Sequence, residues 1–546
     1  MIKNNCLKEL NLLFHCTKII NIHRSTTVWL SCLLVLGISG CSTLPKQYAQ
    51  PTHYAFQSDT SQTALAKMIQ PLRQMHPDLT GYHILYDPLE ALSTRIHLID
   101  KAEKTLDLQY YIWDNDRIGA LALYSIINAA NRGVKVRLLI DDNNAKKMEG
   151  VFLALDQHAN IDVKLYNPYG FRQHRLLDIA LDLKRVNRRM HNKSFIVDNQ
   201  IALIGGRNMS DQYYNLSDKY QFSDVDILLV GTAADEIIHS FDEYWNDDYA
   251  FPVRQIVDHQ RYPLRYDGLK QQLDAHYQEA SVQNYLDLAY RSQTFEKWLN
   301  QDIKFNWTTA EVVKDSPSKI KSRATKEEHL NFQLLKHLKE PNHSIDIISA
   351  YFVPEKVGTQ KLSELAKSGI KVRVLTNSFA ANDVSIVHAF YSKYRQELLE
   401  NDVELYEFLY APDQENLNAN IEEFSKKAKV SLKGLSRSSL HAKLMAIDEK
   451  QVFIGSFNFD PRSSYLNTEI GVLLDSPELA AGVHETMDNH LAKYAYKLVL
   501  DANHHINWQV PKPNGEVRTF TDEPKLKWYQ KALLKITSWL PIEGLM

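Results

Sequence analysis

Residues 191–198 read HNKSFIVD and residues 441–448 read HAKLMAID, so the chain contains the pattern His-x-Lys-x4-Asp twice. In each copy six residues follow the aspartate, and then come a glycine, a small residue, a third residue and an asparagine, at 205–208 and 455–458. One such pattern can arise by chance in a chain with 21 histidines. Two copies with the same spacing and the same tail are a strong signal, and they decide the interpretation of the sequence.

Other landmarks recur in the same order around these motifs. The strand-like stretch 105–113 matches 344–352 at an offset of 239 residues, and Gly133 matches Gly369 at an offset of 236. Landmarks that keep their order at a nearly constant offset indicate a duplicated domain. Apolar runs alternating with helical periodicity predict an α/β fold. We expect two duplicated lobes, each a mixed or parallel sheet flanked by helices, with the active site between them.

The predicted organisation follows from these landmarks. It comprises a signal peptide at 1–40, a tether at 41–80, a first lobe at 81–250, a helical connecting segment at 251–340, a second lobe at 341–500 and a tail at 501–546. The tail has large apolar residues between Trp528 and Ile542 beside four lysines. This pattern is compatible with an interfacial helix and equally with a helix packed on the body.

The chemistry of the motifs follows from strand geometry. A histidine and a lysine two residues apart on a strand point to the same face. Two such units face to face would surround one cavity with two imidazoles, two ammonium groups and two amides. The lysines and asparagines would stabilise a phosphodiester in an in-line transfer, while one imidazole attacks phosphorus and the other protonates the leaving alcohol. Because lysine supplies the positive charge, we predict no metal and no cofactor.

The candidate site residues form two groups. The predicted catalytic residues are His191, Lys193, Asp198, His441, Lys443 and Asp448. The predicted phosphate-binding or orienting residues are Asn208, Asn458, Asp224, Glu469, Arg207 and Ser456. The two motif aspartates are explained at least as well as carboxylates that brace a turn at a strand end.

Two carboxylates after the motifs have a more specific prediction. Asp224 and Glu469 fall at matching places on the following strands, and we expect each to orient the histidine of the facing lobe. A surface carboxylate is the alternative. For Arg207 and Arg462 a phosphate contact and a plain salt bridge both remain open. Basic clusters at 184–189 and 426–437 either guide anionic head groups or form solvated faces.

With these motifs the sequence resembles the phospholipase D superfamily. Further segments are similar to its bacterial cardiolipin synthase C branch, namely LDLQYYIW at 106–113, LIDDN at 139–143, NRRMHNK at 187–193, TNS at 376–378 and LPIE at 540–543. The resemblance implies cardiolipin synthesis by phosphatidyl transfer, with phosphatidylglycerol and phosphatidylethanolamine, or a second phosphatidylglycerol, as lipid substrates. It also implies a phosphohistidine intermediate, with His191 as nucleophile and His441 as general acid and base.

Three other functions compete with this one. A hydrolytic phospholipase D would differ only in using water as the acceptor and would release phosphatidic acid. A nuclease is disfavoured because the net charge of −3 gives no basic field for nucleic acid. A degenerate binding domain is disfavoured because both His-Lys pairs are intact. We therefore expect membrane phospholipids as partners and no nucleic acid, while an accessory protein stays unknown.

The N-terminus predicts a location. All four cysteines lie within the first 41 residues, so the body has neither a disulfide framework nor a Cys-ligated metal. Basic residues precede an apolar run at 28–38, which suits a signal peptide. The small residues before Cys41 resemble a bacterial lipobox, which implies lipidation of Cys41. We expect a periplasm-facing lipoprotein, in the outer membrane because Ser42 follows; a plain secretory signal and an uncleaved anchor are the alternatives.

Overall fold

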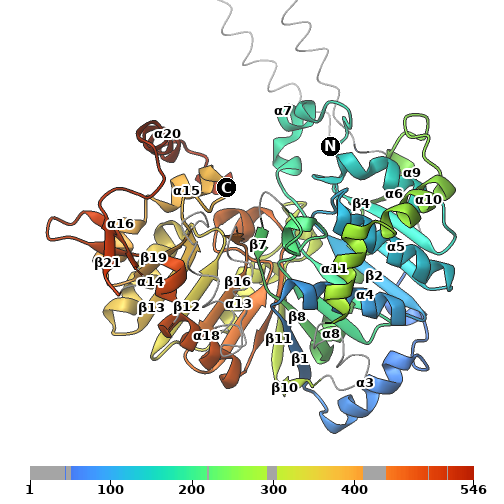
Figure 1. The fold of residues 1–546 in the computed structure, drawn as a ribbon, viewed down its shortest axis with the longest axis horizontal. Helices are drawn as coiled ribbons and strands as arrows, with labels where there is room; N and C mark the ends of the chain where they lie inside the picture. Colours follow the sequence, from blue (N-terminus) through green and yellow to red (C-terminus); the bar gives the residue numbers. More distant parts are fainter. Residues whose placement is uncertain are drawn as a thin grey trace, which may run out of the picture. The chain divides into compact units, whose positions relative to one another are not determined.

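The computed structural model describes residue 44 and residues 51–217, 221–291, 304–409, 438–489, 491–512 and 515–545. The chain divides into two units, Met1–Leu44 and Pro45–Met546, and the second contains both sheets of Figure 1. The predicted signal peptide, Cys41 and the basic cluster at 426–437 lie outside the described residues.

The first sheet has nine strands in the order β10-β1-β8-β6-β5-β2-β3-β4-β9. Strands β2, β3 and β4 are parallel to one another, and the other pairs are antiparallel. The bounds are β1 Thr80–Leu85, β2 Thr105–Tyr110, β3 Lys135–Asp141, β4 Ile161–Tyr166, β5 Ser194–Val197, β6 Ile201–Gly205, β8 Asp226–Gly231, β9 Ala250–Pro252 and β10 Asn306–Thr308.

The second sheet has ten strands in the order β11-β18-β17-β16-β12-β13-β14-β19-β20-β21. From β11 to β19 it repeats the order that the first sheet has from β1 to β9, including the parallel trio β12, β13 and β14. The bounds are β11 Ala310–Lys314, β12 Ser344–Ser349, β13 Lys371–Asn377, β14 Glu404–Phe408, β16 Lys443–Ile447, β17 Gln451–Gly455, β18 Ile470–Leu474, β19 Ala495–Leu500, β20 Ile506–Pro511 and β21 Val517–Phe520. The predicted duplication is thus present strand by strand.

Helices cover the sheets on their outer faces (Figure 1). The bounds in the first part of the chain are α3 Ala64–Met75, α4 Pro88–Lys101, α5 Arg117–Asn131, α6 Glu149–Leu155, α7 Arg175–Val186, α8 Thr232–Trp245, α9 Val253–Ile256, α10 Tyr266–Tyr277 and α11 Ala280–Tyr290. Those in the second part are α13 Leu330–His337, α14 Glu355–Lys367, α15 Ser385–Tyr391, α16 Arg395–Glu400, α18 Pro477–Asn489, α19 Leu491–Tyr494 and α20 Trp528–Ser538.

The repeated glycines end equivalent helices. Gly133 follows α5 with φ of 101°, and Gly369 follows α14 with φ of 91°. The amide of Gly133 donates to the carbonyl of Ala130 at 3.0 Å, and the amide of Gly369 donates to that of Ala366 at 2.9 Å. A left-handed residue at this place closes a helix and is usually glycine, because other side chains are strained there. Each glycine therefore turns its helix into the next parallel strand.

One apolar cluster joins the two lobes. It contains residues of β5, β6 and β8 from the first sheet, residues of β16, β17 and β18 from the second, and one side of α8. Separate clusters lie under the outer helices of each lobe. Burial of this cluster stabilises the pairing of the lobes, since each Å² of apolar surface removed from water contributes about 25 cal/mol. The interface thus holds the strands that carry the motifs at a fixed relative position.

The fold class is confirmed, and two segment descriptions need correction. The segment expected to be a helical connection, 251–340, ends in strands: β10 joins the first sheet and β11, which follows directly, joins the second. The second sheet thus begins at residue 310 rather than after 340. The tail expected at 501–546 supplies β20 and β21 as edge strands before α20. Of the strands that the sequence landmarks missed, β10, β20 and β21 lie outside the duplicated pattern, and β11 is the counterpart of β1, which was not a landmark either.

Candidate active site

The motif histidines are anchored by the opposite lobe. A small two-stranded sheet joins β7 (Gln221–Ser223) of the first lobe to β15 (Ser438–Leu440) of the second. The backbone amide of His441 donates to the carbonyl of Ser223 at 2.8 Å, and that of His191 donates to the carbonyl of Thr468 at 2.9 Å. Ser223 and Thr468 directly precede the two carboxylates that were predicted to orient the histidines. The backbone therefore fixes the register between each histidine and its carboxylate.

The carboxylates reach the imidazoles across the lobe boundary. Glu469 binds Nδ1 of His191 at 2.8 and 3.0 Å, and Asp224 binds Nδ1 of His441 at 2.6 Å. Each histidine thus has its partner in the other lobe, as the sequence predicted. A carboxylate on Nδ1 fixes the tautomer and leaves Nε2 for the reacting group.

The small residues after the motifs make room for these pairs. A side chain at Gly206 would meet the carboxylate of Asp224, because its Cβ would lie 2.3 Å from Oδ1. At the matching position Ser456 donates its hydroxyl to Oε2 of Glu469 at 2.5 Å, and Ser463 donates to Oε1 at 2.9 Å. Ser456 therefore has the orienting role, since it holds the carboxylate that holds His191.

The lysines lie beside the histidines and are buried with them. Lys193 donates to the carbonyl of His191, and Lys443 donates to that of His441 and lies 2.8 Å from its Nδ1. Lys193 and Lys443 are each 2% exposed. Burial lowers the pKa of Lys193 to about 7 and that of Lys443 to about 8. The carboxylates Glu469 and Asp224 offset part of this cost of burial, and an anionic phosphate in the site would offset more of it.

The two imidazole-carboxylate pairs differ in charge. Burial, followed by the charge of Lys193, lowers the pKa of His191 well below its usual value, and burial raises that of Glu469 to about 7. Burial and Lys443 also lower the pKa of His441. Burial alone would raise the pKa of Asp224, but the charges of His441 and Lys443 lower it below its usual value. Asp224 is therefore the more firmly ionised carboxylate of the two.

Aromatic rings and an asparagine complete the walls. Tyr111 lies edge-on to His191 with ring centroids 5.0 Å apart, and Tyr213 lies edge-on to His441 at 5.2 Å. Asn208 accepts from the amide of Ile112 at 3.0 Å and donates to the hydroxyl of Tyr213 at 2.8 Å. Asn208 is thus occupied in orienting the site. Oδ1 of Asn458 is buried and accepts no hydrogen bond from the described residues.

Asp198 and Asp448 are not at the reacting centre, and their predicted catalytic role is corrected here. Asp198 accepts hydrogen bonds from the backbone amides of residues 103–105, the last at 2.9 Å. Asp448 does the same for the amides of residues 342–344, the last at 3.0 Å. Each aspartate therefore braces the start of the neighbouring central strand, β2 or β12. The motif spacing alone could not separate this role from catalysis.

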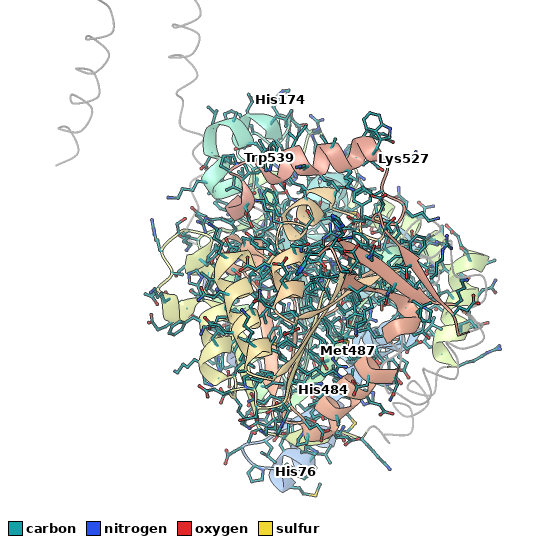
Figure 2. All side chains as sticks on the ribbon, turned by 90° about the vertical axis from the view of Figure 1, so that its left-hand side faces the viewer. His76, His174, His484, Met487, Lys527 and Trp539 are labelled. Carbon is teal, nitrogen blue, oxygen red and sulfur yellow. The ribbon has the colours of Figure 1, made fainter. Side chains whose placement is uncertain are left out.

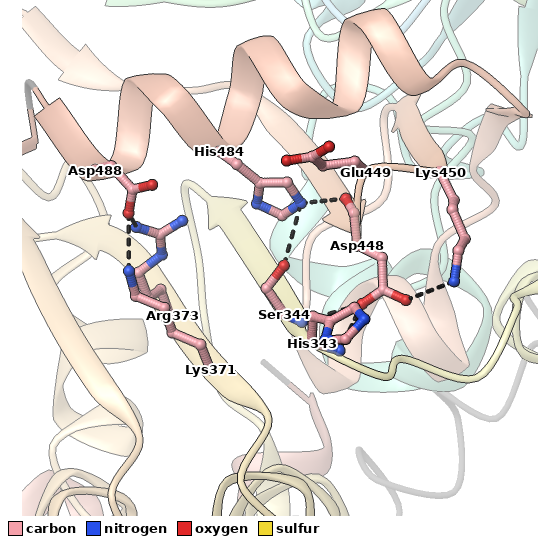
Figure 3. A pocket seen from close by; sticks show the side chains of 9 residues that line it. All are labelled: His343, Ser344, Lys371, Arg373, Asp448, Glu449, Lys450, His484 and Asp488. Carbon is pink, nitrogen blue, oxygen red and sulfur yellow. Dashed lines mark hydrogen bonds and ion pairs between the residues drawn. The ribbon is translucent and has the colours of Figure 1, made fainter.

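Figure 3 shows the surroundings of Asp448. Asp448 lines a cavity of about 570 Å³ together with residues that include Arg373, His484 and Asp488. Within the group drawn, Lys450 pairs with Asp448 at 3.0 Å and Arg373 pairs with Asp488 at 2.5 Å. None of the motif histidines or lysines lines this cavity. It is separate from the site between the lobes.

The arginines bind protein groups. Arg207 is 1% exposed, lies 3.3 Å from Asp226, and donates to the carbonyl of Asp224 at 2.6 Å. The alternative of a phosphate contact is therefore wrong for Arg207, which positions the backbone of Asp224. Arg462 donates to the side chain of Asn187 at 2.9 Å and to the carbonyl of Leu545 at 3.2 Å.

Sequence reasoning missed the pair of residues that pins each histidine strand. Asp141, at the end of β3, accepts from the amide of Met190 at 2.9 Å. Asn377, at the matching end of β13, accepts from the amide of Leu440 at 2.9 Å and donates back to its carbonyl at 2.8 Å. Both lie in stretches that carried the family resemblance, LIDDN and TNS, but neither stretch showed which atoms they bind.

Two features are absent from the part of the chain that the structure describes. No group of three or more His, Cys, Asp or Glu side chains there has the arrangement of a metal site. No helix among those residues is both long enough and apolar enough to cross a bilayer.

Comparison with known proteins gives a consistent answer. A family model described as "Cardiolipin synthase, PLD-like domain" matches residues 95–245 and 334–491. The chain is 37% identical over 482 residues to cardiolipin synthase C of Escherichia coli. This alignment covers 88% of this chain and 99% of that protein. The chain belongs to the phospholipase D-like cardiolipin synthase family. As a member it is an enzyme of the phospholipase D type, in the phosphatidyltransferase and phosphodiesterase class.

Two further matches extend the comparison. An uncharacterized protein of Helicobacter pylori is 32% identical over 462 residues, which is 83% of this chain and 87% of that one. The crystal structure of phosphatidylserine synthase from Haemophilus influenzae aligns with a TM-score of 0.52 at 14% identity, over 88% of this chain and all of that chain. At this identity the structural match supports the duplicated fold.

The placement of the motif aspartates gives a stability prediction. Asp198→Asn and Asp448→Asn should each lower the free energy of unfolding by about 1–3 kcal/mol, because buried backbone amides lose a charged acceptor. Chemical denaturation measures this loss, with exposed Asp287→Asn as the control. The folded fraction should keep its turnover within about tenfold. Unchanged stability together with lost turnover would return these aspartates to the catalytic group.

The cross-lobe pairs give a second prediction. Glu469→Gln and Asp224→Asn should lower kcat by about 10²- to 10⁴-fold, because an amide no longer fixes the imidazole tautomer or supports its charge. Nitrogen NMR of the imidazoles should show altered tautomers in the same variants, while exposed Glu311→Gln should change neither readout. If both variants keep the wild-type kcat, the carboxylates do not position the histidines.

Proposed function

We propose that the enzyme transfers a phosphatidyl group from phosphatidylethanolamine, or from a second phosphatidylglycerol, to the head-group hydroxyl of phosphatidylglycerol, and so forms cardiolipin. The observation that carries this proposal is the pair of buried His-Lys units, each held by a carboxylate of the other lobe. The similarity to cardiolipin synthase C along most of the chain supports the choice of lipids.

In the proposed first step, Nε2 of His191 attacks phosphorus. The low pKa of His191 keeps its imidazole neutral and therefore nucleophilic at neutral pH. The phosphorus-nitrogen bond forms as the bond to the leaving alcohol breaks, and His441 gives that alcohol its proton. The ionised Asp224 supports the protonated His441 through Nδ1. Lys193 and Lys443 stabilise the phosphoryl oxygens.

In the proposed second step, the neutral His441 takes the proton of an acceptor hydroxyl. The acceptor oxygen attacks phosphorus, the phosphorus-nitrogen bond breaks, and neutral His191 is restored. The difference between the two carboxylates supports this division of roles, because Glu469, with a pKa raised to about 7, supports a charged imidazole less than Asp224 does. Water as acceptor would give hydrolysis instead.

We also propose that the protein is a membrane lipoprotein that faces the periplasm, attached through Cys41, in the outer membrane. The basic residues, the apolar run at 28–38 and the small residues before Cys41 support this location. Mass spectrometry of the protein from membranes would show an acylated N-terminal Cys41 if it is correct. An unmodified chain that retains residues 1–40 would contradict it.

Product analysis tests the reaction directly. Full-length protein with phosphatidylglycerol and phosphatidylethanolamine should yield cardiolipin together with released head-group alcohol. Phosphatidic acid as the only product would support the hydrolytic alternative. His191→Ala should abolish any phosphoenzyme and lower kcat by at least about 10³-fold, whereas His441→Ala should slow both steps. Exposed His259→Ala is the matched control, and wild-type turnover in either active-site variant would contradict the two-histidine mechanism.

The lysine pKa values predict the pH dependence. In the free enzyme kcat/KM should fall as pH rises past about 7 to 8, because Lys193 and Lys443 lose the ammonium charges that bind phosphate. Lys193→Arg keeps its charge in this range, so the fall should move from about pH 7 towards about pH 8, where Lys443 titrates, even if the maximum rate is lower. A pH profile of initial rates measures this shift. A fall at the same pH in wild type and Lys193→Arg would contradict the assignment to lysine.

A further inference from the structure

Helix α7 turns its apolar side to solvent and its charged side to the protein. Its exposed apolar side chains are Leu176, Leu177, Ile179, Leu181 and Leu183, which are between 40 and 79% exposed. On the inner side Asp178 accepts from the amides of Gly170 and Phe171 at 3.0 and 2.7 Å, and Arg185 donates to the carbonyl of Pro168 at 2.8 Å. An ordinary surface helix has the reverse arrangement. The inner contacts fix α7 in this orientation.

Helix α20 has a similar outward stripe. Tyr529, Leu533, Ile536 and Leu540 follow one another at helical spacing and are between 45 and 62% exposed. Trp528 and Trp539 stand at the two ends of the helix and are 82 and 73% exposed. Lys527, Lys531 and Lys535 form a row on the other side of the helix, because each lies two residues from a member of the stripe and so about 200° around the axis, and residues 525–540 contain no acidic residue. Helix α20 also packs against α15.

The two helices lie at the same end of the molecule. Both are at the top of Figure 1, and Figure 2 shows His174, which precedes α7, close to the level of Lys527 and Trp539, with His76 at the opposite end. Arg462 connects them, since it binds Asn187 at the end of α7 and the carbonyl of Leu545 after α20. Three residues separate Asn187 from His191. The apolar helices therefore lie next to the segment that carries a catalytic histidine.

We propose that α7 and α20 form a membrane-docking face, which rests on the surface of an anionic phospholipid bilayer with its apolar side chains below the head groups. The proposal goes beyond the attachment by Cys41, because it states which side of the folded enzyme meets the lipid. It rests on the proposed function only in its consequence, namely that lipid substrates enter from that side.

The chemistry of the face favours a bilayer over a protein partner. Exposed apolar stripes of this extent mark interaction sites. Tryptophans at the ends of an apolar stripe are typical of the membrane interface, and lysines on a helix without acidic residues match anionic head groups. An amphipathic helix that lies in the interface buries its apolar side only as far as the acyl boundary.

Depth-sensitive labels test the docking directly. The test uses the full chain with its native cysteines replaced by serine, Cys6→Ser, Cys16→Ser, Cys32→Ser and Cys41→Ser, so that one added cysteine carries the only label. An environment-sensitive fluorophore is placed in separate proteins by Leu181→Cys or Leu533→Cys on the face, and by Met75→Cys or Leu335→Cys elsewhere. Met75 and Leu335 are matched controls, since they are 64 and 72% exposed. The vesicles contain phosphatidylglycerol and phosphatidylcholine with brominated acyl chains.

Bromine should quench the labels at 181 and 533 and leave those at 75 and 335 unquenched. Equal quenching at all four positions, or none at any, would overturn the proposal. Labels at 181 and 533 that are shielded from water before vesicles are added, in a protein that sediments as a dimer, would assign the face to a second copy of the chain and would also overturn it.

An activity measurement separates this proposal from the proposed function. The double variant Leu181→Glu with Leu533→Glu should lose about tenfold or more in kcat/KM on vesicle phosphatidylglycerol and keep its activity on a short-chain, monomeric phosphatidylglycerol. Leu335→Glu should retain activity on both. Equal losses of the double variant on both substrates would contradict docking. A wild-type enzyme inactive on every lipid would contradict the proposed function, while the quenching experiment would still decide the docking face.

Discussion

Each motif imidazole is bound at Nδ1 by a carboxylate from the other lobe, and the site depends on this exchange. Glu469 crosses to His191 and Asp224 crosses to His441. Neither lobe alone contains both a motif histidine and the carboxylate that orients it. The backbone pairing of β7 with β15 and the apolar cluster between the sheets fix the lobes closely enough for these bonds of 2.6 to 2.8 Å. Duplication followed by face-to-face packing thus creates a site that one copy could not supply.

The two halves of the site are similar in geometry and unequal in charge. Burial raises the pKa of Glu469 to about 7, although the charge of Lys193 and hydrogen bonds from two serine hydroxyls act to lower it. Asp224 lies against Gly206, where no side chain can stand, and the charges of His441 and Lys443 keep it ionised. Burial lowers the pKa of both imidazoles, but it does so further for His191, and Asp224 acts to raise the pKa of His441 and so supports its charged form. A double displacement at phosphorus needs one neutral and one charged imidazole.

The sequence predicted the duplicated fold and the members of the site that follow from spacing. Two motifs with one spacing predicted His191, Lys193, His441 and Lys443, and matching positions after them predicted the crossed carboxylates. Spacing could not predict the role of Asp198, because an aspartate at a strand end and one in a cavity occupy the same place in the motif. It also missed β10 and β11, because neither they nor β1, the counterpart of β11, were among the landmarks, and both take their place through pairing with distant strands. The apolar side of α7 faces solvent because the buried Asp178 on its other side binds the amides of Gly170 and Phe171. Helical spacing alone does not predict these contacts.

In the proposed mechanism, two opposed histidines act in sequence on one phosphorus atom. The stereochemical course at phosphorus tests it most directly, with phosphatidylglycerol made chiral at phosphorus by oxygen isotopes. Two successive in-line displacements, through His191 and then through the acceptor, each invert the configuration. The two-histidine mechanism therefore predicts net retention of configuration at phosphorus in the product. Net inversion would show a single direct displacement and would contradict the mechanism built on the crossed pairs.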